Sequence, residues 1–446
     1  MTNTAHEAVS VSVREVLPTT GGICSMALYV VHFAALPALV GCLSGLAGLL
    51  LALILHFVQH LAFGYSNDAV ISSESFLQGV TNASAARRVT VLLLCGVVAG
   101  FGWYGLAKFG RPLTSVSQAV SARLTKMPFV ETVIHGLLQM ITVALGSPLG
   151  REVAPREWGA MLAQRVARIA RVSSGEARLL VACGSGAGLA AVYDVPIAGT
   201  IFVMEVLLKK FRPTIAVSAA MSCFLAAWIA RIELGEDLQY SIPSFSVDKS
   251  LMVWAILLGS PFGAAGFAFA RWTSRCALNA PAGTDRIWKS LLAFGLVGVL
   301  SIGLPQLLGN GKGPAELAFS DHLPTGLAAT LIAVKILCVS LVLRAGARGG
   351  LLTPGFSLGA LLAVVVGGIF HPWLPVTSMG NLAILGASAF LSSSMAMPMT
   401  AILLAMEFTD APGILLIPIL LAVCGSTVAR ETLNRIVGRR SIPTAT

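Results

Sequence analysis

Long apolar blocks, separated by short polar intervals, fill most of this chain. Some blocks reach the roughly 20 apolar residues that a bilayer-spanning helix needs. Others are too short to span alone, and they predict pairs of half-helices. The predicted blocks lie at 22–62, 88–109, 128–147, 156–171, 175–192, 195–209, 213–232, 250–273, 287–308, 324–344, 356–370, 379–394, 397–409 and 412–435.

Polar intervals at the two ends and in the middle divide the chain into two apolar halves. The middle interval, ELGEDLQYSIPSFSVDK, carries several charges and turn formers. We therefore predict a domain order in which two transmembrane repeats are joined by a connector. The expected segments are a polar tail at 1–21, a first repeat at 22–232, a connector at 233–249, a second repeat at 250–438 and a short tail at 439–446.

Composition strengthens the membrane interpretation. Hydrophobic residues make up 56% of the chain and charged residues only 11%, whereas soluble domains carry about 25% charged residues. The 45 glycines and 21 prolines are typical of transporters, whose broken helices line a cavity. The sequence thus predicts an all-α polytopic integral membrane protein.

The formal charge of +10 does not indicate nucleic-acid binding, because the basic residues are scattered between apolar blocks. Clusters such as Lys209–Lys210 fit loop charges that orient a membrane protein. His56 and His60 have an i, i+4 spacing that can bind metal, but no third ligand stands near them. We expect neither a metal nor a cofactor, and an integral-membrane enzyme is only a remote alternative.

The two halves contain a repeat. At a constant offset of 202, GSGAGLAAVYDVPIAGTIFVME (184–205) aligns with GASAFLSSSMAMPMTAILLAME (386–407), so that Pro196 matches Pro398 and Glu205 matches Glu407. A Gly/Pro-interrupted motif precedes each copy, GREVAP at 150–155 and GGLLTP at 349–354. Corresponding broken segments in two halves predict a binding site at the membrane midplane. The repeat itself leaves open whether the halves are parallel or inverted.

The first broken motif places one carboxylate, Glu152, at the start of a predicted helix. A helix start offers unpaired N–H groups and a partial positive charge, which together attract an anion. A carboxylate there can fill the site when charged and leave it when protonated, so Glu152 is a candidate gate and proton acceptor. The alternative is that Glu152 pairs with Arg151 or Arg156 at an aqueous boundary.

Two further segments offer anion donors. In GARGGLLTPGFSLGA (346–360), backbone amides and the hydroxyl of Thr353 can donate, although a plain helix break is an equal alternative. In TSVSQAV (114–120), Ser115 or Ser117 can donate a hydroxyl. A lone serine more often bonds its own backbone, so this second signal is weak.

Taken together, these motifs resemble the CLC family of chloride channels and proton-coupled anion antiporters. GREVAP is similar to the family's GREGP, residues 184–205 to its GxxAGLAAAFxAPLAGxLFxxE, and GGLLTPGFSLGA to its GGxFxPxLxxGA. The motifs come in family order over about 110–410. The resemblance implies an inverted-repeat helical fold, a homodimer with one pore per subunit, and anions held at helix N-termini.

The resemblance also assigns residues. Glu152 matches the gating glutamate. The anion-binding positions that it implies are Ser115, Gly150, Arg151, Leu351, Leu352 and Thr353. It further leads us to expect no cytoplasmic CBS domains.

Departures from the family pattern concern the proton route. Val206 stands where many antiporters keep an inner proton-transfer glutamate, and Pro443 falls where a pore tyrosine is expected. The GREVAPRE form and the Leu352 loop look like the bacterial fluoride-exporting branch, so chloride and fluoride both remain open. We expect a halide antiporter in the lipid bilayer of the bacterial inner membrane that exchanges its anion for protons. A passive voltage- or pH-gated channel is the alternative.

Overall fold

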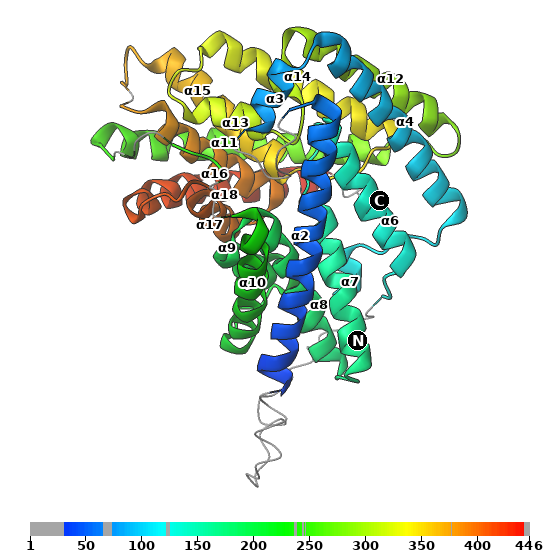
Figure 1. Ribbon diagram of the computed structural model, residues 1–446. Helices are drawn as coiled ribbons and strands as arrows, with labels where there is room; N and C mark the ends of the chain where they lie inside the picture. The colour runs from blue at the N-terminus through cyan, green and yellow to red at the C-terminus, as the bar shows by residue number, and fades with distance from the viewer. Residues whose placement is uncertain are drawn as a thin grey trace, which may run out of the picture.

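The computed structural model describes residues 31–65, 74–121, 125–235, 239–242, 245, 247–375 and 377–440. The predicted tail at 1–21 and Pro443 lie outside this part of the chain. Within it, seventeen α-helices, α2 to α18, account for nearly all the regular structure (Figure 1). The only extended pairing among these described residues is a single isolated bridge. The predicted all-α class is confirmed.

Most helices overlap a predicted apolar block, whereas three short ones lie between the blocks: Phe76–Asn82, Val116–Ala119 and Lys312–Phe319. In the first half the helices are α2 (Leu36–Phe63), α3 (Phe76–Asn82), α4 (Ala85–Phe109), α5 (Val116–Ala119), α6 (Phe129–Ala144), α7 (Val153–Ile169), α8 (Ser174–Tyr193), α9 (Pro196–Phe202) and α10 (Pro213–Leu234). In the second half they are α11 (Lys249–Leu278), α12 (Asp285–Gly303), α13 (Lys312–Phe319), α14 (Thr325–Ala345), α15 (Leu352–Phe370), α16 (Met379–Met395), α17 (Pro398–Thr409) and α18 (Leu416–Arg440).

Length and hydropathy divide these helices into two groups. Eight of those described are long and apolar enough to cross a bilayer, among them α2, α11 and α14. Others, such as α6 at Phe129–Ala144 and α16 at Met379–Met395, are apolar but shorter. Because a span needs about 20 residues, the short helices confirm the predicted broken elements. The chain is a multi-pass membrane protein.

Both halves use the same close helix crossing. In the first half α7 packs on α8, and a Cβ at Gly159 would lie 2.0 Å from the carbonyl oxygen of Gly184. In the second half α15 packs on α16, and a Cβ at Gly359 would lie 2.5 Å from the carbonyl oxygen of Gly386. Only glycine permits backbones to approach so closely, a common means of helix packing in membranes. The crossing therefore fixes the helix that carries each broken motif.

The matched glutamates of the repeat tie the halves together reciprocally. Glu205 accepts hydrogen bonds from the backbone N–H groups of Met399 and Thr400, at 2.9 and 2.8 Å, where α17 begins. Glu407 accepts from Ile197 and Ala198, at 2.9 and 2.7 Å, where α9 begins. Each half thus caps the short helix of the other with a carboxylate, which suits the positive end of a helix.

Loss of one of these caps should destabilise the protein. In Glu205→Gln the side chain keeps its size but loses its charge, and it can accept at only one oxygen. Hydrogen bonds to charged groups contribute about 1.5–3 kcal/mol each, so we expect a lower apparent melting temperature in detergent. Glu233→Gln, at an exposed position near the end of α10, is the control. Equal melting of both variants and the parent would contradict the capping role.

Candidate functional site

The two broken motifs meet at a pair of glycines. The N–H of Gly150 donates to the carbonyl of Gly350 at 2.7 Å, and the N–H of Gly350 donates back to the carbonyl of Gly150 at 2.9 Å. This antiparallel bridge joins the loop before α7 to the loop before α15. The starts of two helices from opposite halves are therefore held side by side at the point that the repeat predicts.

Glu152 occupies this junction. It is the residue directly before α7 and is 0% exposed. Its Oε1 accepts a hydrogen bond of 2.8 Å from the backbone N–H of Leu352, the first residue of α15. The carboxylate of one half thus sits at the positive helix start of the other half, in the position where an anion would bind.

The space for this carboxylate exists because both bridging residues are glycines. A Cβ at Gly350 would lie 1.7 Å from Oε1 of Glu152, and a Cβ at Gly150 would lie 2.1 Å from Oε2. Any side chain at either position would therefore expel the carboxylate.

Tyr193 holds the other oxygen of the carboxylate. This residue ends α8, and its hydroxyl donates to Oε2 of Glu152 at 3.2 Å. Its ring packs edge-on against Phe408, with 5.3 Å between the centroids. Sequence reasoning missed Tyr193, although it lies inside the repeated segment, where the second copy has Met395. The presence of a tyrosine in the first copy, where the second copy has a methionine, was the only feature of the sequence that pointed to it.

The loop before α15 supplies a backbone donor to the site, as the motif GGLLTP predicts. Leu352 supplies the N–H donor, and Leu351 precedes it as the residue before α15. Thr353 is 0% exposed, and among the described residues its Oγ1 has no hydrogen-bond partner. A buried hydroxyl without a partner is costly, so Thr353 remains a candidate donor to a bound anion.

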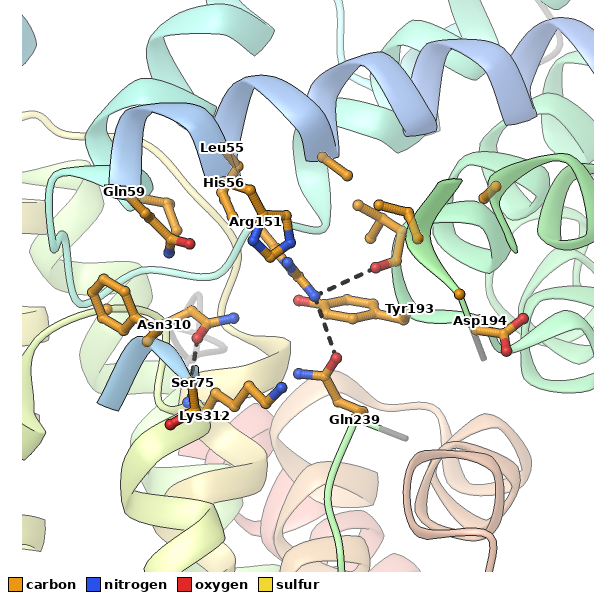
Figure 2. A pocket seen from close by; sticks show the side chains of 18 of the residues that line it. Leu55, His56, Gln59, Ser75, Arg151, Tyr193, Asp194, Gln239, Asn310 and Lys312 are labelled. Carbon is orange, nitrogen blue, oxygen red and sulfur yellow. Dashed lines mark hydrogen bonds between the residues drawn. The ribbon is translucent and has the colours of Figure 1, made fainter. Parts of the chain in front are cut away.

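Arg151 turns away from Glu152. Its Nη2 donates to the amide oxygen of Gln239 at 3.2 Å and lies 3.4 Å from the carbonyl oxygen of Val192. Its guanidinium lies 5.0 Å from the ring centroid of Tyr193. Figure 2 shows these contacts at the edge of a cavity. No ion pair joins Glu152 to Arg151 or Arg156 among the described residues, so the boundary-pair alternative is not what the fold adopts.

The cavity beside Arg151 has a volume of about 670 Å³ and is rich in basic groups. Arg151, Arg231 and Lys312 line it, together with His56 and His60, whereas its acidic residues are Glu74 and Asp194. Asp194 is already paired with Arg231 at 2.8 Å. The lining thus carries three cationic side chains against two carboxylates, a small excess of positive charge that favours anions over cations.

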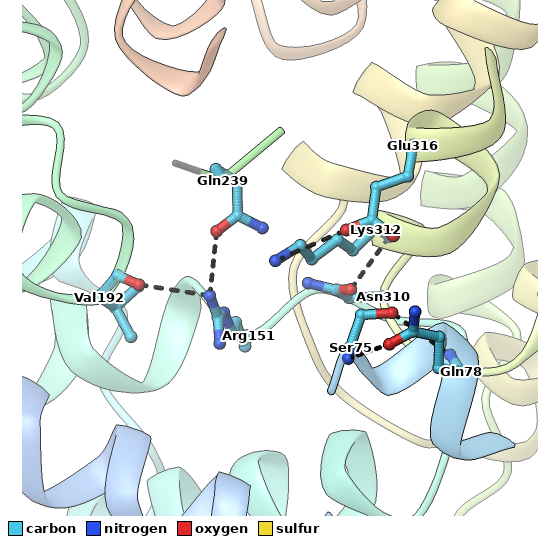
Figure 3. A network of polar contacts seen from close by, with 8 residues as sticks. All are labelled: Ser75, Gln78, Arg151, Val192, Gln239, Asn310, Lys312 and Glu316. Carbon is cyan, nitrogen blue, oxygen red and sulfur yellow. Dashed lines mark hydrogen bonds and ion pairs between the residues drawn. The ribbon is translucent and has the colours of Figure 1, made fainter. Parts of the chain in front are cut away.

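Polar contacts on the far side of the cavity fix the position of Lys312. Its backbone N–H donates to the side chain of Asn310 at 3.2 Å, and its ammonium lies 3.6 Å from Glu316 (Figure 3). Behind it Lys335 is 0% exposed and donates to the carbonyls of Leu307 and Gly309, at 3.0 and 2.7 Å. Lys335 thus adds a buried amine that is held by two backbone carbonyls.

The serine segment leads into the short helix α5, which packs against α7 and α8. Ser115 is exposed and forms a capping box with Gln118 at the start of α5, so its hydroxyl accepts from the N–H of Gln118 at 3.2 Å. Ser117 is exposed as well. No hydrogen bond links either serine to Glu152 or Leu352 in the part of the chain that is described. The anion-binding role of Ser115 stays a prediction, as do the assigned roles of Gly150 and Arg151.

His56 and His60 both line the cavity. No group of three or more histidine, cysteine, aspartate or glutamate side chains suited to a metal ion occurs among the residues that the structure covers. Val206 is half-buried in a π-helical segment after α9. It stands at the sequence position where the family pattern has an inner proton-transfer glutamate.

Comparisons with known proteins agree with this geometry. A family model described as voltage gated chloride channel matches residues 91–430. The chain is 25% identical over 413 residues to the H(+)/Cl(−) exchange transporter ClcA of Vibrio campbellii, covering 89% of this chain and 86% of that protein. It is 28% identical over 306 residues to ClcA of Klebsiella pneumoniae, covering 66% of this chain and 65% of that protein.

Two solved structures share the fold. A slow cyanobacterial Cl−/H+ antiporter superposes with a TM-score of 0.78 at 20% identity, covering 92% of this chain and 98% of that one. A CLC-type fluoride/proton antiporter superposes with a TM-score of 0.71 at 18% identity, with the same coverage. The predicted CLC-type helical fold is that of these structures.

A methyl group at the glycine bridge should displace the carboxylate of Glu152. In Gly350→Ala the new Cβ would overlap Oε1, so the side chain must leave the Leu352 N–H. We expect Glu152 to become accessible to a water-soluble carbodiimide, measured as labelling of its peptide by mass spectrometry. The control is Gly355→Ala, on the helix that follows this loop, where the new Cβ would lie 3.2 Å from its nearest neighbour, the hydroxyl oxygen of Ser394. Glu152 should stay unlabelled in this variant. Equal labelling of the parent and Gly350→Ala would disprove the steric argument.

Proposed function

Because this chain belongs to the voltage gated chloride channel family, we propose that it moves a small anion, chloride or fluoride, across a membrane in exchange for protons. The observation that carries the proposal is the carboxylate of Glu152 at the start of α15. A charged carboxylate excludes an anion from that N–H donor. A protonated carboxyl group is attracted much less to the Leu352 N–H, so it leaves this donor free for an anion.

The exchange follows from that competition. A proton that neutralises Glu152 weakens its bond to the Leu352 N–H and frees the donor for an anion. Arrival of the anion in turn disfavours return of the charged side chain, because two negative charges at one site repel. Proton and anion therefore alternate at one position, which is the requirement for antiport. The basic cavity beside Arg151 supplies anions to it by electrostatic attraction.

Related transporters support both the ion and the location. The ClcA proteins are named H(+)/Cl(−) exchangers and come from bacteria, and a fluoride/proton antiporter shares the fold. We therefore place this protein in the bacterial inner membrane. A passive channel is the second candidate, and the observation that favours it is Val206 at the inner glutamate position.

Flux measurements in liposomes test the proposal. We expect an outward chloride or fluoride gradient to drive protons uphill through the parent protein, measured for both ions with and without a proton shunt. Glu152→Gln keeps the shape of the side chain but cannot exchange a proton, so proton movement should fall at least tenfold while passive anion flux persists.

Glu176→Gln is the matched control, because Glu176 sits in a capping box on α8 that glutamine also satisfies. If proton coupling survives in Glu152→Gln, Glu152 is not the gate. Anion flux through the parent without uphill proton movement would establish the passive channel instead.

We also propose a homodimer through the face formed by α9, α10, α17 and α18. On this face the capping carboxylates Glu205 and Glu407 lie only partly buried, beside the exposed residues Ile197 and Met399. A carboxylate facing lipid is costly, so a second copy that covers the face would remove the cost. A groove lined by Phe224 and Trp228 lies on the same face.

Light scattering in detergent should give a protein mass of twice 46.3 kDa. The double variant Phe224→Ala with Trp228→Ala removes apolar area from the groove, so we expect a shift toward the monomer. Phe57→Ala with Leu61→Ala, at exposed positions of α2, is the matched control and should stay dimeric. A monomeric parent protein would exclude the dimer.

A further inference from the structure

Arg156 lies one helical turn past the gate. It is four residues after Glu152 on the helix that follows it, so the two side chains lie on the same side of α7, about 6 Å apart along the axis. Its guanidinium stacks on the ring of Phe202 in α9, at 4.4 Å from the centroid. The side chain is half-buried.

This guanidinium forms no direct ion pair, although the carboxylates of Glu152 and Glu157 lie near enough to attract it electrostatically. Within the described part of the chain Arg156 donates no hydrogen bond and forms no ion pair, and its Nε is shut off from solvent without a partner. The two carboxylates nearest in sequence are engaged elsewhere. Glu152 is bonded to Leu352 and Tyr193, and Glu157 accepts from Gln139 at 3.3 Å and lies 3.8 Å from His135.

A partly buried cation without a direct ion pair or hydrogen bond is unfavourable inside a membrane protein. Removing a guanidinium from water costs more than a face-on contact with one phenylalanine returns. Charged residues at this depth pair with another charge or mark the route of an ion. A mobile anion would supply the direct partner that the Arg156 guanidinium lacks.

We propose that Arg156, stacked on Phe202, forms a second anion-binding site one turn inside the gate, and that the transported halide occupies it. This inference rests on the proposed function, since it uses the same ion. A guanidinium presents five N–H donors in a fixed fork and stays charged at every physiological pH. It replaces part of the hydration shell that the halide loses on leaving the basic cavity.

The site also provides a second place, besides the Leu352 N–H, where Glu152 and the anion compete. Side chains at i and i+4 can reach each other on a helix, so a charged Glu152 that leaves Leu352 can pair with Arg156. A halide at Arg156 and a charged Glu152 at Arg156 then exclude each other. Protonation of Glu152 removes the competitor and leaves the anion on the guanidinium.

Anion binding to the purified protein tests the site. Titrations with sodium fluoride and sodium chloride, followed by calorimetry, should show at least tenfold weaker binding in Arg156→Leu than in the parent. Arg156→Lys keeps the charge but loses the fork, so its affinity should lie between the two. Arg165→Leu is the matched control, because Arg165 also stacks on a phenylalanine, Phe129 at 4.1 Å, but is exposed on the same helix.

Unchanged affinity in Arg156→Leu, or an equal loss in Arg165→Leu, would overturn the site. If Arg156→Leu fails to fold by size-exclusion chromatography, bromide-soaked crystals of the parent decide the matter. An anomalous peak within hydrogen-bond distance of the Arg156 guanidinium supports the site, and a map without one rejects it.

Liposome flux through the parent separates this result from the proposed function. A parent protein that moves no halide refutes the function. A parent protein that transports halide but binds none at Arg156 refutes only the inference.

Discussion

One hydrogen bond organises the centre of this protein, that from the N–H of Leu352 to the carboxylate of Glu152. The first N–H groups of a helix have no partner within the helix, and the interior of a membrane protein offers little water to replace one. The donor must therefore be satisfied by something negative. In the described structure a side chain from the opposite half satisfies it, and the glycine bridge at Gly150 and Gly350 leaves room for only one occupant.

The rest of the architecture keeps that junction rigid. The close crossings of α7 on α8 and of α15 on α16 hold the two helix starts, because backbones in contact through glycines cannot slide without a clash. The reciprocal caps by Glu205 and Glu407 fix the short helices α9 and α17. Each device occurs once in each half, so the repeat supplies two similar supports around one site.

Basic side chains make the surroundings of Glu152 positively charged. Arg151 faces the cavity with neutral acceptors as its hydrogen-bond partners, Arg156 lies on the other side of Glu152 with an aromatic ring, and Lys335 binds backbone carbonyls. None of the three forms an ion pair among the described residues. Glu152 thus lies near cationic side chains with which it forms no direct ion pair, and in the proposed function its charge state decides whether a mobile anion replaces it at the Leu352 N–H.

The sequence by itself determined most of the helices and singled out the candidate gate. Apolar blocks and Gly/Pro breaks depend on local hydropathy and backbone preference, so they located α11 at Lys249–Leu278 and the short α17 within a few residues. The offset of 202 matched Glu205 with Glu407, and the helix-start argument singled out Glu152. Only the tertiary structure decided the partners. Tyr193 and Leu352 lie 41 and 200 residues from Glu152 in the chain, and the packing of other helices, rather than local pattern, sets where side chains point. For the same reason the side chain of Arg151 bonds to Gln239, and the guanidinium of Arg156 stacks on the ring of Phe202 without a direct ion pair.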